Sequence, residues 1–295
     1  MANKSKVLTF GSACKGSVGG SSMLIMSESL KAEYTWHEPT ETGLVGTAKP
    51  QNLGRQVVKK DVKGQVGVQP SYVHLNTIME KCFNEASSNT FTPHTAVTST
   101  DIDIVLDRSV DVYTYESCWV SNVTIDSREN EPVLVTLDLL GQDETNEGEV
   151  SDLTLTDRVL NSDLTVAINS NTYFPMSAKW MFDYRPTERF HQSTTRSTVG
   201  HGIPECKVEL EMDMNSDNWA DLFALAGTDT ALSNVILTWT DGDAAFAFTM
   251  ASMTVISASR TPDTSGVDAV TGTVELKAWS SDGSTDLFSA VYTPA

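Results

Sequence analysis

The sequence lacks several features that would assign it to a common class of protein. Its four cysteines, Cys14, Cys82, Cys118 and Cys206, stand singly among 295 residues, without the paired spacing of zinc sites or the density of a disulfide scaffold. No stretch approaches the roughly 20 apolar residues of a membrane span, and the N-terminal apolar patch is too short for a signal peptide. We expect reduced thiols, no membrane partner and synthesis in a cytoplasm without export.

Motifs of catalysis are also missing. There is no G-x-S-x-G or H-E-x-x-H motif, and the glycine-rich segment Gly16 to Gly20 has neither a Walker lysine nor a helix pattern after it. The histidines are scattered singly, at His37, His74, His94, His191 and His201. We expect no enzyme activity, no cofactor, no metal and no catalytic residues.

One acidic segment begins like a calcium-binding loop. Asp213, Asn215 and Asp217 have the alternate spacing of an EF-hand. The sixth position is Asn218 where the sharp turn needs glycine, and the twelfth is Ala224 where a bidentate glutamate should stand. A helix N-cap is the better interpretation.

His201, Glu205 and Cys206 lie close enough in sequence to suggest a zinc site, because imidazole and thiolate suit that ion. Gly202 and Pro204 instead mark a loop, and no second His/Cys pair lies nearby. The segment is interpreted as a polar loop that leads into a strand.

Two carboxylate pairs, Asp101 with Asp103 and Asp241 with Asp243, could be imagined as glycosidase acids. Asp241-Gly242-Asp243, however, has the composition of a hairpin turn. Asn122-Val-Thr124 spells a glycosylation site, but no export signal accompanies it.

The tryptophans could act as stacking platforms, but nearly all lie in or beside predicted strands, so core packing is the expectation. They are Trp36, Trp119, Trp180, Trp219, Trp239 and Trp279.

Positive charge is scarce. The net charge is −19, with −8 in residues 1–150 and −11 in residues 151–295. Tight binding to nucleic acid requires clustered Lys and Arg, so this balance argues against it, and solubility is the simplest interpretation of the acidity.

What the chain does contain is a composition typical of strands and turns: Val, Thr, Ser and Asp are abundant, 40% of residues are hydrophobic and 20% are charged. It also contains an internal repeat. MLIMSESLKAEY (23–34) matches YFPMSAKWMFDY (173–184) at an offset of 150. The length alone favours two domains.

The repeat continues along both halves. Polar stretches at 37–57 and 185–204 predict arms or long loops. Alternating strands follow at 62–70 and 208–214, and then a helix in each half. The apolar residues of these helices are Tyr72, Leu75, Ile78, Met79 and Cys82 in the first, and Trp219, Leu222, Phe223 and Ala226 in the second.

Each half then closes with strands in the same order. They are predicted at 102–106, 112–115, 118–125 and 133–140, and again at 235–239, 244–250, 253–257 and 270–279. An acidic, glycine-containing linker at 141–152 divides the halves. The expected organisation is a flexible N-terminal arm (1–21), a first unit (22–152) and a second unit (153–295) that ends in a short tail from about Gly283.

The phrase SESLKAEY (27–34), the V-x-G-x-V strand (Val62, Gly64, Val66) and the P-x-x-x-x-L-x-x-I helix start that opens at Pro70 resemble the major tail tube proteins of long-tailed, non-contractile bacteriophages. The second half resembles the same unit more loosely, because Val208-Glu-Leu210 replaces the V-x-G pattern. Together the resemblance covers roughly residues 22–280.

The resemblance implies a mainly β fold with two tandem β-sandwich or split-barrel units, each with a short flanking helix and a long loop or hairpin arm. It implies stacked rings, trimeric and pseudo-hexameric, in a virion tail through which DNA is ejected. The implied partners are the chain itself, a tape-measure protein, a tail terminator, a distal tail protein and genomic DNA that passes without specific binding.

Two other functions remain open at this point. A terminator or distal tail ring of the same fold would form one ring and stop. A carbohydrate-binding or adhesin β-sandwich module would bind glycans as a monomer.

Overall fold

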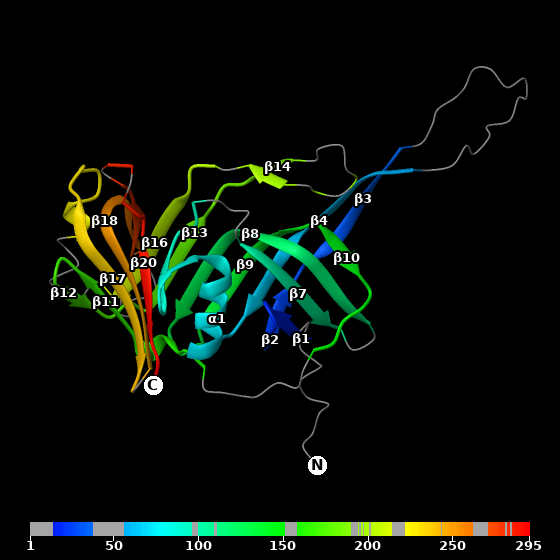
Figure 1. Cartoon of the computed structure of the whole chain (residues 1–295). Coiled ribbons are helices and arrows are strands. Elements are labelled where there is room, and N and C mark those ends of the chain that lie inside the picture. The colour runs from blue at the N-terminus through cyan, green and yellow to red at the C-terminus, as the bar shows by residue number, and fades with distance from the viewer. Residues whose placement is uncertain are drawn as a thin grey trace, which may run out of the picture.

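The structure is a computed structural model of the chain, and it is mainly β, with 65% strand. It describes residues 14–37, 56–95, 100–108, 111–150, 158–189, 194, 196, 198–200, 202–213, 222–242, 244–261, 271–280, 282–283 and 285–295. Figure 1 shows the strands in two neighbouring groups, with α1 between them. The predicted β class is confirmed.

The first half of the chain forms a closed six-stranded barrel instead of the expected sandwich or split barrel. Around the barrel the strands are β1 (Cys14–Val18), β2 (Ser21–Glu28), β4 (Gln56–Val68), β9 (Leu134–Gly141), β8 (Val112–Arg128) and β7 (Asp101–Asp107), and β7 returns to β1. Every pairing is antiparallel. Closure leaves these strands without the open edges of a flat sheet.

The start of the chain differs from the expected flexible arm. Residues 14–18 form β1, which pairs with both β2 and β7, whereas residues 1–13 lie outside the described part. Gly19 and Gly20, with φ of 56° and 88°, make the two-residue turn into β2. Glycine suits this turn because both positions need positive φ, so the glycines that suggested mobility specify a hairpin.

The helix α1 (Tyr72–Cys82) is confirmed with the predicted buried face: Tyr72, Leu75, Ile78, Met79 and Cys82. Ser71 begins it by accepting a hydrogen bond from the His74 backbone N–H. Residues 222–224 are helical where the second helix is expected, but residues 214–221, which include Trp219, lie outside the described part.

Shorter strands surround the barrel. β3 (Lys31–His37) pairs with the first half of β4, and the two extend away from the barrel at the upper right of Figure 1. The remaining additions are β5 (Asn84–Ser87), β6 (Thr90–Thr92) and β10 (Asp143–Thr145).

The second half follows a matching path. Its strands are β11 (Leu164–Ile168), β12 (Asn171–Tyr173), β13 (Ser177–Asp183), β16 (Glu205–Asp213), β19 (Thr271–Ala278), β18 (Ala244–Thr261) and β17 (Leu232–Asp241), preceded by the single turn η2 (Asn161–Asp163). β12 and β13 occupy the place of β2 and the start of β3, with an interruption at residues 174–176. β17 returns to β11.

The register of this second path repeats that of the barrel. Gly16 pairs with Met23, and the residues 150 positions later, Val166 and Tyr173, also pair. Further round, Lys63 pairs with Leu140, and Lys207 pairs with Lys277. Each strand keeps one constant offset from its counterpart through such pairs, except at the start of β7, where Asp101 pairs with Trp119 while Leu232 pairs with Met253. Outside that point the two paths correspond residue by residue.

One difference between the paths explains a glycine. Gly64 has φ of +153°, and a Cβ there would lie 2.5 Å from the Ser29 carbonyl oxygen, where β2 bends into β3. Its counterpart by register is Val208, which is fully buried. The glycine of the V-x-G-x-V pattern is therefore required by a close backbone approach in the first half only.

The two halves share one sheet. Beyond β7, residues 122–128 of β8 pair with all of β13. Phe83, at the end of α1, packs against Trp180, Phe182 and Phe288 of the second core. The expected C-terminal tail also differs, since β20 (Ser289–Thr293) pairs with β18 and β6.

Candidate interaction surfaces

The first candidate surface is the ribbon, defined as β3 with residues 56–61 of β4. Tyr34, Trp36 and Val58 are 46%, 52% and 47% exposed, an unusual concentration of large apolar groups. The Tyr34 and Trp36 ring centroids lie 6.3 Å apart, and the Lys60 ammonium lies 5.6 Å from the Tyr34 ring. The ribbon lies at the base of the first predicted arm, residues 37–57, of which residues 38–55 lie outside the described part.

The second predicted arm lies against the molecule. We call it the strap, which comprises β14 (Thr187–Arg189), β15 (Thr198–Gly200), Thr194 and Arg196. The Lys60 N–H donates to the Thr194 carbonyl at 2.6 Å, so the strap lies along the edge of β4.

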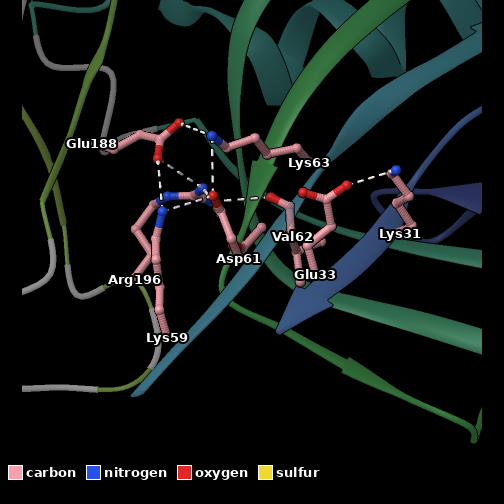
Figure 2. A network of polar contacts seen from close by, with 9 residues as sticks. Lys31, Glu33, Lys59, Asp61, Val62, Lys63, Glu188 and Arg196 are labelled. Atoms are coloured by element: carbon pink, nitrogen blue, oxygen red, sulfur yellow. Dashed lines mark hydrogen bonds and ion pairs between the residues drawn. The ribbon is translucent and has the colours of Figure 1, made fainter. Parts of the chain in front are cut away.

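Arg196 anchors the strap (Figure 2). Its side chain is fully buried and donates to the carbonyls of Val62 and Gly141, at 3.1 and 2.6 Å, and to the Asp61 carboxylate. Glu188 of the strap lies 3.6 Å from the same guanidinium. A buried guanidinium needs this density of acceptors, because desolvating the charge is costly.

Two lysines complete the network. Lys59 and Lys63 each lie 3.0 Å from Asp61, and Lys63 lies 2.6 Å from Glu188. Burial alone would raise the pKa of Asp61, but hydrogen bonds from Lys63 and Lys59 and the charge of Arg196 outweigh it and lower the pKa. Burial alone would lower the pKa of Lys63, but its hydrogen bonds to Glu188 and Asp61 and their negative charges outweigh burial and raise the pKa.

The shared sheet presents a polar face. Across β8, β13, β16 and β19, one row places Asp126, Lys179, Glu209 and Glu275 side by side. Ion pairs join neighbouring rows, for example Lys277 with Glu205 at 2.6 Å. The alternate residues of these strands are buried, so the face is the solvent side of a one-sided sheet.

Of the suggested metal ligands, Glu205, Cys206 and Asp213 lie in the described part of the chain. Glu205 and Cys206 are consecutive in β16, so they point to opposite faces, and burial raises the pKa of the Cys206 thiol. Asp213 ends β16, whereas His201, Asn215 and Asp217 lie outside the described residues. Within the described part, no three His, Cys, Asp or Glu residues come together as metal ligands.

The carboxylate pairs are in strands and turns. Asp241 pairs with Ala244 across a two-residue connection, which confirms the predicted hairpin turn, although Asp243 itself is not described. Asp103 accepts the Ser117 N–H at 2.9 Å. The side-chain amide of Asn122, the asparagine of the glycosylation motif, donates to the Asp138 carboxylate at 3.1 Å.

The tryptophans divide into two groups. Trp119, Trp180 and Trp239 are buried as expected, whereas Trp36 and Trp279 are 52% and 44% exposed. His74 and His94 are half-buried, and burial lowers the pKa of both. Among the described residues no helix has the length and apolar character to cross a bilayer.

Arg196 was not predicted from the sequence. It lies in a polar stretch that resembles any long loop, and only its tertiary partners distinguish it. No family model matches this sequence, and no curated protein matches it with significance.

Proposed function

We propose that the chain is a virion structural protein that assembles with copies of itself into stacked rings, which form the tail tube of a long-tailed bacteriophage. The carrying observation is the residue-by-residue correspondence of the two strand paths, which supports two tandem tail-tube units in one chain. The sequence resemblance supports the same conclusion. Three chains with two units each would give a pseudo-sixfold ring.

The surfaces described above suit this role. The ribbon offers an apolar contact to a neighbouring copy, and the net charge of −19 would keep phosphate from adhering as DNA passes. The proposed partners are further copies, a tape-measure protein, a tail terminator and a distal tail protein. No catalytic step is part of the proposal.

Light scattering coupled to gel filtration, with negative-stain microscopy over a range of concentrations, tests the proposal. We expect a trimer of about 96 kDa, three times 32.1 kDa, and tubes at high concentration. A single closed ring that never grows would instead indicate a terminator or distal ring. A chain that stays monomeric at every concentration would sink the proposal.

A glycan-binding function is the second candidate, and one observation favours it. Trp279 lines an open hollow of about 560 Å³ together with His94 and Asp286, and an exposed indole beside polar groups can stack on a sugar ring. Glycan-array binding that is lost in Trp279→Ala would support this function, whereas an array without binders would exclude it.

A further inference from the structure

The β8–β13 contact inside the chain is a strand pairing between the two corresponding halves. Its two partners have counterparts elsewhere in the same molecule. By register, residues 122–126 of β8 correspond to 257–261 of β18, since Val120 pairs with Leu139 as Val255 pairs with Leu276. Residues 177–183 of β13 correspond to 27–33, at the end of β2 and the start of β3.

The β18 edge has no strand partner among the described residues. β17 pairs with residues 244–253 of β18 only, so residues 256–261 extend past the end of β17 and, within the described part of the chain, are unpaired on that side. Ile256 is 43% exposed there, and Ser257 and Ser259 are exposed, whereas their counterparts Asn122 and Thr124 are half-buried beneath β13. An exposed edge with an apolar side chain is a template for another strand.

The counterpart edge, at residues 28–34, is closed by side chains. The Leu30 carbonyl accepts from the Tyr115 hydroxyl at 2.9 Å and from Arg108 at 3.1 Å. The Ala32 N–H donates to the Glu144 carboxylate at 3.2 Å. Side chains can protect an edge until a strand replaces them, and within the described part no strand occupies this one.

We propose that the β18 edge of one copy pairs with the residue 28–34 edge of a second copy, repeating the β8–β13 contact between chains. This inference rests on the proposed function and names the ring interface. Inside the chain Met181 faces Thr124, and the corresponding pair between chains is Lys31 with Ser259. Asp183 faces Asn122, and the corresponding pair is Glu33 with Ser257. Because both edges belong to every copy, the contact is head-to-tail and can close a ring.

Cysteine cross-linking tests the register directly. Lys31→Cys and Ser259→Cys chains with different tags are mixed and oxidised. In the proposed pairing, residues 31 and 259 face each other without exchanging backbone hydrogen bonds. Their Cα atoms would therefore lie about 4.5 Å apart, within disulfide range. We expect a mixed disulfide dimer. The matched control replaces Ser259→Cys by Val73→Cys, on α1, where Val73 is 62% exposed. Cys82, Cys118 and Cys206 are buried, and the parent chain gives the background.

A proline substitution provides the second arm. The Tyr184 N–H donates to the Ser121 carbonyl. Because backbone groups alternate in direction along a strand, the N–H and carbonyl of Val123 also point towards β13, and Val123 is the counterpart of Ala258. Ala258→Pro therefore removes an N–H that faces the second copy and spares the β18–β19 hydrogen bonds. We expect monomers with an unfolding midpoint close to that of the parent.

The outcomes separate the two proposals. Rings or tubes that form without the Lys31–Ser259 cross-link, or that persist in Ala258→Pro, would overturn this interface and leave the assembly function standing. A parent chain that forms no particles, together with cysteine variants that form no cross-link, would overturn both.

Discussion

The ribbon, at the base of the first predicted arm, and the strap, in the second, lie differently in the structure. The ribbon extends from the barrel with Tyr34 and Trp36 exposed, whereas the strap lies on β4 and buries Arg196 completely. Tyr34 and Tyr184 correspond in the repeat: the ribbon contains Tyr34, and the strap begins three residues after Tyr184. Corresponding segments of a repeat can therefore diverge, one towards a free surface and the other towards an internal fastening.

The difference lies in the partners each arm finds. The strap places one guanidinium against two carbonyls and two carboxylates, so its position is fixed by charge and hydrogen bonding. The ribbon is held by the β3–β4 pairing and by ion pairs with little burial, such as Lys31 with Glu33. Substitutions in the strap should reduce stability, and those in the ribbon should change association.

The largest effect is expected from Arg196→Met. It removes a buried charge from Asp61 and leaves the Val62 and Gly141 carbonyls without this donor, so the free energy of unfolding should fall by about 3 kcal/mol. Urea denaturation measures the loss. Lys31→Met, which breaks an exposed pair, is the matched control and should leave the midpoint unchanged; equal midpoints for both variants would contradict the role of the strap.

Glu188→Gln should have a smaller effect. The side chain is 26% exposed and retains hydrogen-bonding capacity, so the loss of its charge beside Lys63 should cost about 1 kcal/mol. The same urea experiment applies. A double substitution with Arg196→Met should destabilise by less than the sum, because both residues belong to one network, and strict additivity would argue against that network.

The contribution of Asp61 to stability should not change with pH near neutrality and should decrease in acid. The folded pKa of Asp61 lies below its unfolded value of about 3.9, so its contribution is complete above that pH and is lost as pH falls through the folded pKa. Thermal unfolding of the parent and Asp61→Asn should therefore converge below about pH 4. A stability difference that stays constant from pH 7 to pH 3 would contradict this.

The smallest effect on stability is expected from Trp36→Ser in the ribbon. The side chain is half exposed, so the free energy of unfolding should change by less than about 0.5 kcal/mol. Sedimentation velocity should nevertheless show weaker association, because the proposed contact loses its largest apolar group. Phe174→Ser, at a residue that is 75% exposed outside the ribbon, should change neither quantity.

Periodic patterns predicted much of the fold. α1 was predicted with all five buried residues, and the alternation at residues 133–140, 235–239 and 270–279 located β9, β17 and β19. Two pairs of predicted strands, 112–115 with 118–125 and 244–250 with 253–257, are single strands, β8 and β18. In β8 a register irregularity opposite Ile102 and Ile104, where Ser117 has φ of 48°, interrupts the alternation without ending the strand. In β18 the two residues 251 and 252 between the buried Met250 and Met253 have the same effect.

The rest depended on tertiary contacts. β1 is short and belongs to a segment rich in Lys, Gly and Ser, so its composition suggests a loop, and only its pairing with β2 and β7 makes it a strand. β20 and Arg196 similarly acquire their roles from partners far away in the sequence. Local propensity contains no information about such partners.

The pairing of β8 with β13 has a consequence for proteolysis. A protease that cut the chain between residues 150 and 158 would leave β8 in the N-terminal fragment and β13 in the C-terminal fragment, still paired over seven residues. The two fragments should migrate together on a gel filtration column and separate only in denaturant. Neither fragment should fold alone as the intact chain does, because each would expose one side of that pairing to water.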